Sequence, residues 1–177
     1  MWIAMFSQSG TEIAEISKKL NRWPDLILSN NKEKDLIHKD IRMRSSLYRG
    51  THNKLIKLIE HNVKAQSKCI PFITLHGYLR IMPDLPYEMF NGHPGDIETY
   101  PELIGKDPQK KAVELKLPST GCIIHKVTQN LDQGPIIARE KYIMKGDETD
   151  LILYERLRII AIDMWTKFLK ERMNEAV

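Results

Sequence analysis

The sequence is poor in cysteine and in long apolar runs, and both shortages exclude classes of protein. Among 177 residues there are two cysteines, Cys69 and Cys122, and they lie far apart. A disulfide framework or a zinc ribbon needs paired cysteines, so we exclude both and interpret each cysteine as a small buried side chain. The longest apolar runs, such as 70–75 and 134–138, are far shorter than the roughly 20 residues that cross a bilayer. We therefore expect no membrane-spanning segment and no membrane partner.

The composition is that of an ordinary folded domain. Hydrophobic residues make up 42% of the chain and charged residues 28%, which excludes disordered and collagen-like chains. The length corresponds to one domain, so we predict a single domain over residues 1–177. The first residues, 1–6, lack the basic segment and cleavage site of a signal peptide and favour a cytoplasmic protein with a first strand there.

The charge has one sign in excess, but it is not concentrated. The formal net charge is +4 and the isoelectric point is about 9.0. Lysine and arginine alternate with aspartate and glutamate along the chain, and no zinc-finger or aromatic RNA-binding motif is present. A nucleic-acid partner is therefore not expected.

The first half alternates short apolar segments with amphipathic ones. We predict strands over 2–7, 25–30 and 69–75 and helices over 11–20 and 53–62. Pro71 indicates that the third strand starts late. The lysine-rich stretch 32–43 has weaker periodicity and is not placed. Strands that alternate with helices predict an α/β fold with a mostly parallel sheet flanked by helices.

The second half has a different pattern. Short helices are predicted over 84–90 and 108–115, followed by strands over 122–128 and 135–143 that pair as an antiparallel hairpin. Residues 147–150 offer helix caps for a long last helix. Its expected buried face comprises Leu151, Leu153, Leu157, Ile160, Ala161, Met164, Phe168 and Leu169.

Two polar side chains follow a predicted strand at the place where open α/β sheets put ligands. Asn91 and His93 lie two residues apart, so in an extended segment both side chains point the same way. An amide and an imidazole directed at one point suit a developing oxyanion. Asn91 could equally cap a turn, and His93 could be a hydrogen-bonded loop histidine.

A carboxylate, Asp132, stands in a turn directly before an apolar strand. Aspartate before glycine is common turn chemistry, but the same carboxylate could also partner a histidine. A metal site built from His93, His125 and Asp132 is a weaker alternative, because these residues form no compact ligand motif.

Four motifs in order resemble the folate-dependent formyltransferases, a family that includes phosphoribosylglycinamide formyltransferase and the sugar amine N-formyltransferases. They are Gly77-Tyr78-Leu79-Arg80-Ile81-Met82, Asn91-Gly92-His93-Pro94-Gly95, Gly121-Cys122-Ile123-Ile124-His125-Lys126-Val127 and Leu131-Asp132-Gln133-Gly134-Pro135-Ile136-Ile137. The resemblance implies a Rossmann-like sheet and an enzyme of one-carbon metabolism. It would transfer a formyl group from 10-formyltetrahydrofolate to a small amine, without a metal.

The resemblance also implies roles for particular residues. Asn91, His93 and Asp132 would be catalytic, with Asn91 and a protonated His93 donating to the oxyanion and Asp132 favouring the imidazolium. The residues implied to hold the folate donor, largely through backbone groups, are Leu79, Arg80, Ile81, Met82, Gln129, Asn130, Leu131 and Gly134. Leu79, Ile81 and Met82 could equally be core residues at the end of a strand.

The amine acceptor is less defined. Ser9, Gly10 and Thr11 lead into a helix N-terminus, which can bind a phosphate through free backbone amides. Around this turn the chain departs from the glycine-rich pattern of the purine-pathway enzymes. It does resemble the sugar amine subgroup at 93–95 and 105–108. A phosphorylated or sugar-nucleotide amine is therefore expected, and transfer RNA is disfavoured because the chain is short.

Two alternatives stay open. Water could replace the amine, which would make the protein a formyltetrahydrofolate hydrolase, or the fold could bind folate or a nucleotide without chemistry. The long last helix could cover the sheet or form the face of a homodimer.

Overall fold

The computed structural model describes residues 1–65 and 70–174. The chain divides into two compact units, Met1–Phe90 and Asn91–Val177, with the boundary inside strand β5 (Glu88–His93). The single domain over 1–177 stays a prediction. Among the described residues, no helix is both long and apolar enough to span a membrane.

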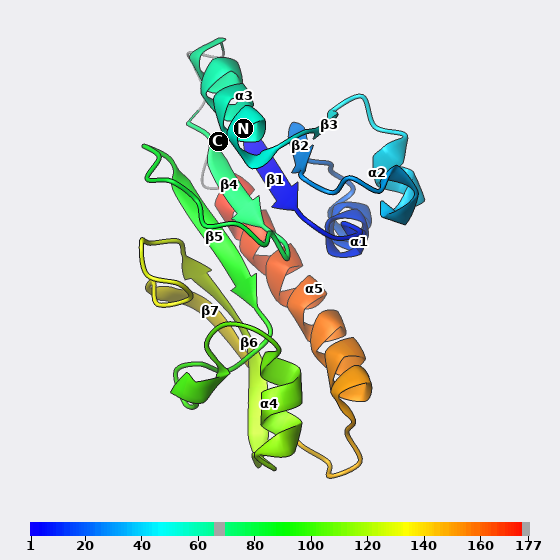
Figure 1. The fold of residues 1–177 in the computed structure, drawn as a ribbon, viewed down its shortest axis with the longest axis vertical. Coiled ribbons are helices and arrows are strands. Elements are labelled where there is room, and N and C mark those ends of the chain that lie inside the picture. Colours follow the sequence, from blue (N-terminus) through cyan, green and yellow to red (C-terminus); the bar gives the residue numbers. More distant parts are fainter. Residues whose placement is uncertain (66–69, 175–177) are drawn as a thin grey trace. The chain divides into compact units, whose positions relative to one another are not determined.

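A parallel sheet forms the centre of the first unit. Its strands are β1 (Trp2–Phe6), β2 (Leu26–Ser29), β3 (Leu47–Arg49) and β4 (Phe72–Leu75). The order is β3-β2-β1-β4, followed by β5, and β1 pairs in parallel with both β2 and β4 (Figure 1). Every residue of β1, β2 and β4 is buried, as expected for parallel strands covered on both faces. This explains why their sequences are continuous apolar runs.

The helices of the first unit follow the strand ends. They are α1 (Thr11–Leu20), α2 (Lys39–Arg42) and α3 (His52–Ala65), and a 3-10 turn covers Lys34–Leu36. Helix α1 buries Ile13 and Ile16 at helical spacing. The residue after the helix, Asn21, is its C-cap and has a left-handed backbone (φ 50°). This conformation lets the Asn21 N–H bond to carbonyls of the last turn.

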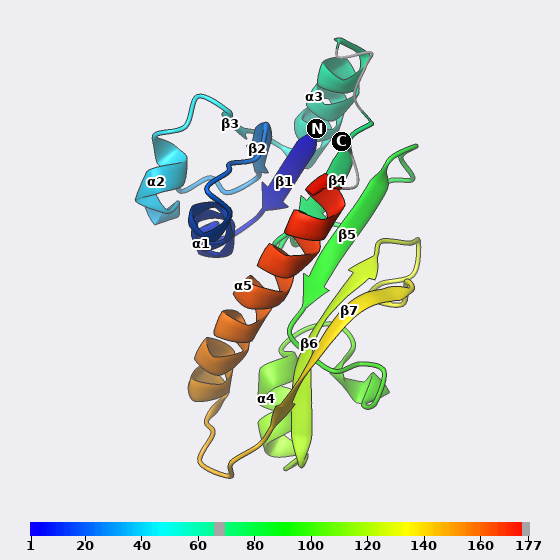
Figure 2. The same ribbon diagram turned by 180° about the vertical axis from the view of Figure 1, so that it is seen from behind.

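The second unit combines a hairpin with a long helix. Strand β6 (Ser119–Lys126) pairs antiparallel with β7 (Ile136–Ile143), and β6 follows β5 in the strand order. Helix α5 (Asp150–Asn174) packs against β6, β7 and the short helix α4 (Pro108–Glu114), as Figure 2 shows. A 3-10 turn covers Pro101–Leu103.

Most of the predicted architecture is confirmed. The mostly parallel sheet flanked by helices, the antiparallel carboxyl-terminal hairpin and the long last helix are all present. Strand β4 starts at Phe72, directly after Pro71, as the proline indicated. Cys122 is buried as predicted, whereas Cys69 lies outside the described residues.

The helix predicted over 84–90 is wrong, because this segment enters strand β5 at Glu88. Pro86 explains the difference. It has no N–H and disfavours a helical backbone at Leu85, so the chain stays extended.

Other differences concern short or partly exposed elements. Strand β3 and helix α2 were not predicted, since three or four residues carry too little periodicity. Of the residues expected to be buried in α5, Leu153, Leu157, Met164 and Leu169 are buried, Ile160, Ala161 and Phe168 are half-buried, and Leu151 is 68% exposed. Ile162 and Trp165 are buried in addition.

Candidate functional site

A cluster of polar side chains in the second unit surrounds the carboxylate of Asp132. Its Oδ1 accepts a hydrogen bond from Asn91 Nδ2 at 3.3 Å and lies 3.5 Å from His125 Nε2. Its Oδ2 lies 3.4 Å from His93 Nδ1 and accepts from the backbone N–H of Gly105 at 3.2 Å. Asp132 is 7% exposed, so these neighbours replace water around a buried charge.

Strand geometry places Asn91 and His93 on the same side of β5. Both reach Asp132 because alternate residues of a strand point to the same face. A Cβ on the intervening Gly92 would lie 2.6 Å from Nε1 of Trp165, so only glycine lets α5 pack against this strand. Asp132 itself adopts a left-handed backbone (φ 54°) in the turn between β6 and β7. The convergence expected from the motifs is therefore present, while the catalytic roles stay predictions.

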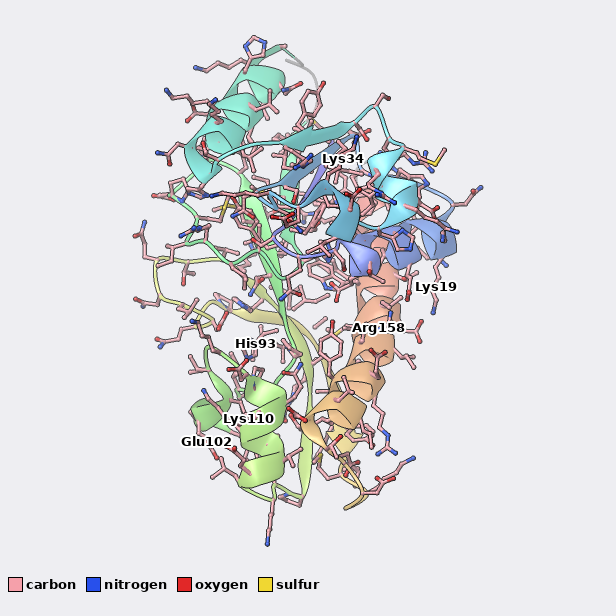
Figure 3. All side chains as sticks on the ribbon, turned by 45° about the vertical axis from the view of Figure 1, so that its right-hand side comes forward. Lys19, Lys34, His93, Glu102, Lys110 and Arg158 are labelled. Carbon is pink, nitrogen blue, oxygen red and sulfur yellow. The ribbon has the colours of Figure 1, made fainter. Side chains whose placement is uncertain are left out.

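The surroundings of His93 act on its pKa in opposite directions. Its Nε2 donates to the carbonyl of Leu103 at 2.9 Å, and its ring is buried. Burial lowers the pKa of His93, and this outweighs the raising effect of Asp132 and of the Leu103 carbonyl. Both ring nitrogens face acceptors, Nε2 the Leu103 carbonyl and Nδ1 the carboxylate of Asp132. Figure 3 labels His93 near helix α4, which carries Lys110.

Asp132, in contrast, is ionised. Burial raises its pKa, but the contacts with His125, His93 and the Gly105 N–H together hold the pKa below its usual value. The cluster therefore joins a carboxylate of lowered pKa to an imidazole of lowered pKa.

His125 is closer to this cluster than the sequence indicated. Its Nδ1 donates to the carbonyl of Lys126 at 2.9 Å. Its Nε2 lies 3.2 Å from Nδ2 of Asn91 and 3.5 Å from Oδ1 of Asp132. The Asn91 amide nitrogen therefore lies within reach of both Asp132 and His125. A β-bulge at Ile124/His125, which no sequence pattern marked, sets the position of this ring.

Sequence reasoning also missed Leu103 and Gly105. Both act through backbone atoms, so their side chains give no signal of the contact. For the metal alternative the structure offers no ligand set: within residues 1–65 and 70–174, no three His, Cys, Asp or Glu side chains are grouped to hold an ion.

The segment 79–82 is a loop in the first unit rather than the end of a strand, since β4 stops at Leu75. Leu79 and Ile81 are 68% and 75% exposed, so they are not core residues, whereas Met82 is buried. Arg80 is exposed as well. The loop is attached to the end of β1 through Ser7, whose Oγ accepts from the Leu79 N–H at 2.8 Å.

In the second unit, Gln129, Asn130 and Leu131 form the exposed start of the turn that carries Asp132. Leu131 is 59% exposed. Gly134 is buried in the same turn, and a Cβ there would lie 1.7 Å from the carbonyl oxygen of Lys126. Glycine is required at this position because the turn folds back onto β6.

Ser9, Gly10 and Thr11 lie at the start of α1. Gly10 is the N-cap residue with a left-handed backbone (φ 71°), and as a glycine it provides no side-chain cap. The hydroxyl of Ser9 accepts from the Thr11 N–H at 3.3 Å and bonds its hydroxyl at 2.8 Å. In the segment predicted to bind the amine substrate, the backbone N–H of Thr11 is therefore already hydrogen-bonded.

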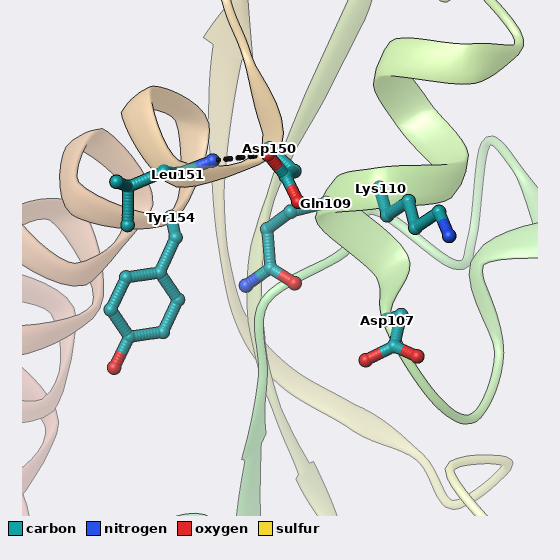
Figure 4. A pocket seen from close by; sticks show the side chains of 6 residues that line it. All are labelled: Asp107, Gln109, Lys110, Asp150, Leu151 and Tyr154. Carbon is teal, nitrogen blue, oxygen red and sulfur yellow. Dashed lines mark hydrogen bonds between the residues drawn. The ribbon is translucent and has the colours of Figure 1, made fainter.

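Figure 4 shows a separate pocket of about 380 Å³ in the second unit. Its lining comprises Asp107, Gln109, Lys110, Asp150, Leu151 and Tyr154. None of the predicted site residues contributes to this pocket.

Comparison with known proteins identifies the relatives of the chain. Residues 32–166 match the model of the formyl transferase family. The chain is 30% identical over 141 residues to the trifunctional purine biosynthetic protein adenosine-3 of Chironomus tentans, and 30% identical over 95 residues to the human protein of the same name. These matches cover 77% and 51% of the chain, which spans 9% of the length of each of these two relatives.

Solved structures support the same fold. Phosphoribosylglycinamide formyltransferase from Bacillus halodurans superposes with a TM-score of 0.80 at 18% identity, covering 100% of this chain and 97% of that one. The enzyme of that name from Anaplasma phagocytophilum gives 0.79 at 21% identity and covers 96% and 84%. With the family model matching more than half of the sequence, the chain belongs to the formyl transferase family.

Proposed function

We propose that the protein transfers a formyl group from 10-formyltetrahydrofolate to the amine of a small acceptor that is phosphorylated or a sugar nucleotide. The observation that carries this proposal is the convergence of Asn91 and His93 on the buried carboxylate of Asp132. Membership of the formyl transferase family supports the reaction class.

The loop 79–82 of the first unit suits part of a flat, partly apolar donor. Its Leu79 and Ile81 expose apolar side chains that water does not favour. When bound, the donor supplies the formyl carbon that the amine attacks.

Asn91 is the residue that can meet the oxygen of the formyl group. This oxygen gains negative charge as the amine attacks, and an amide N–H directed at it stabilises that charge. Both amide hydrogens are engaged in the resting site, but at 3.2 and 3.3 Å they make long hydrogen bonds. A substrate oxygen can therefore displace one of them at small cost, because such contacts tighten only with substrate in place.

His93 and Asp132 can move the proton that the attacking nitrogen must lose. The Nδ1 of neutral His93 accepts this proton directly or through a water. The ionised Asp132, 3.4 Å from that nitrogen, then stabilises the imidazolium that forms. His93 thus acts in this proposal as a base rather than as an oxyanion donor.

Two kinds of amine are the natural acceptors to try. The solved relatives carry the name of phosphoribosylglycinamide formyltransferase, which makes phosphoribosylglycinamide the first candidate. The likeness of 93–95 and 105–108 to the sugar amine enzymes makes an amino-sugar nucleotide the second.

The test follows tetrahydrofolate release from 10-formyltetrahydrofolate with each amine and without any. Acceptor-dependent release with formylated amine as product is the expected result, and Asp132→Asn serves as the inactive control. Release without an acceptor would assign a hydrolase instead. If calorimetry shows binding of neither 10-formyltetrahydrofolate nor tetrahydrofolate, the proposal is overturned.

A further inference from the structure

A second polar pair, His52 and Tyr78, lies in the first unit and takes no part in the cluster around Asp132. The two rings are 5.9 Å apart at an interplanar angle of 33°, and Nδ1 of His52 lies 2.9 Å from the Tyr78 hydroxyl. His52 opens helix α3, whereas Tyr78 lies on the loop that follows β4. The hydrogen bond therefore joins a helix to a loop 26 residues farther along the chain.

This pair has a defined hydrogen-bond direction. Burial raises the pKa of Tyr78 to about 12, although Arg80 lowers it, so the phenol keeps its proton. Burial and then the charge of Arg80 lower the pKa of His52, which keeps the imidazole neutral at neutral pH. Tyr78 thus donates to Nδ1 of His52, and the ring proton is on Nε2.

Tyr78 is one of two buried side chains on the loop 77–82. It is 8% exposed and Met82 is 5% exposed, while Leu79 and Ile81 between them are exposed. Gly77 precedes Tyr78 with a left-handed backbone (φ 62°), and its carbonyl accepts from the Ser7 N–H at 3.2 Å. Of the two buried anchors, only Tyr78 is fixed by a side-chain hydrogen bond, because Met82 has an apolar side chain.

We infer that His52 is a positioning residue for the formyl donor, because its hydrogen bond to Tyr78 fixes the loop that presents Leu79, Arg80 and Ile81. The inference rests on the proposed function, which assigns that loop to the folate. A loop fixed before binding loses less conformational entropy when it meets its ligand.

The test compares donor KM and kcat in Tyr78→Phe, His52→Phe and His52→Gln. Tyr78→Phe keeps the ring and removes only the hydroxyl. His52→Gln offers a carbonyl that can accept from Tyr78 again. The matched controls are Tyr48→Phe and His61→Gln, at exposed positions of β3 and α3. Melting temperatures and the Kd of tetrahydrofolate in calorimetry are recorded for every variant.

Loss of one hydrogen bond should raise the donor KM and the tetrahydrofolate Kd about five- to tenfold in Tyr78→Phe and His52→Phe, with kcat within twofold. His52→Gln should recover part of the affinity, and the controls should match the wild type. A purely structural pair would lower the melting temperature and leave KM unchanged, which would overturn the inference. If His52→Phe does not fold, Tyr78→Phe decides the question.

The outcome separates this inference from the proposed function. A wild-type protein that transfers formyl groups, together with variants of unchanged KM, rejects the positioning role alone. A wild-type protein that neither binds folate nor transfers formyl groups rejects both.

Discussion

Among the buried histidines that face carboxylates, His76 and His93 have different surroundings. In the first unit, His76 Nδ1 lies 2.6 Å from Glu12 Oε1, and Nε2 lies 2.9 Å from the hydroxyl of Thr74. That hydroxyl also accepts from Trp2 Nε1 at 2.9 Å. The hydrogen-bonded series therefore runs through Trp2, Thr74, His76 and Glu12. Each of its contacts is 2.6 to 2.9 Å long.

In the second unit, His93 faces Asp132 at 3.4 Å, and the carboxylate has further neighbours at 3.2 to 3.5 Å. These contacts are longer and shared among several groups. Short, saturated contacts hold a fold together, whereas long, shared contacts can be exchanged for contacts with a substrate. On this comparison we propose a structural role for His76, and the chemical role of His93 is that of the proposed function.

The largest effect should come from the chemical pair. We expect His93→Ala and Asp132→Asn to lower kcat about a thousandfold or more, since they remove the base and the charge that stabilises its protonated form. The melting temperature should stay nearly unchanged. Steady-state kinetics beside thermal unfolding check this, and a large loss of stability in both variants would move His93 to the structural side of the comparison.

Asn91→Ala should have the next largest effect. It removes the amide proposed to meet the oxyanion, which corresponds to a loss of about a hundred- to a thousandfold in kcat. Asn53→Ala, at an exposed position of α3, is the control. Single-turnover kinetics measure the step directly, and a change in KM with unchanged kcat would assign Asn91 to ground-state binding instead.

His76→Ala should show the opposite pattern. Losing the ring leaves Glu12 and Thr74 without this partner and opens a cavity, which should cost about 2 to 4 kcal/mol of unfolding free energy. At a temperature where the variant is folded, kcat should remain within a few-fold of the wild type. Urea unfolding measures the stability of the variant, and steady-state kinetics measures its kcat. A variant that is stable but inactive would show that His76 and Glu12 also take part in chemistry.

The smallest expected effect is a shift in titration. Because burial lowers the pKa of His93, its ring should titrate below its usual value of 6.5. The contribution of His93 to the free energy of unfolding is therefore fully present above pH 6.5. It is lost as the pH falls through the lowered pKa of the folded protein. Asp132→Asn removes a raising influence and should lower the pKa further. Histidine NMR titrations of both proteins check the sign, and an upward shift in Asp132→Asn would contradict it.

The fold was predictable wherever a periodic pattern was long enough. Buried strands such as β1 and the amphipathic α1 show clear apolar spacing, and the β6–β7 hairpin follows from two apolar runs separated by a turn. Strand β3 has only three residues, which is too short for a periodic pattern. Before β5, Pro86 keeps the chain extended where the apolar spacing predicts a helix. Neither difference alters the class of the fold.

The site was predictable in its residue types but not in its protonation. Two-residue spacing places Asn91 and His93 on one side of a strand, and their approach to Asp132 was expected from the motifs. The contact of His93 with a backbone carbonyl and the approach of His125 depend on tertiary packing. Sequence patterns carry no information on either, so the protonation of His93 stays a prediction.

The most direct test of the central claim is transfer of an isotope-labelled formyl group by the wild type and by His93→Ala, at a temperature where circular dichroism shows both folded. We expect the label on the amine with the wild type and about a thousandfold slower transfer with the variant. Equal transfer by both proteins would contradict the account.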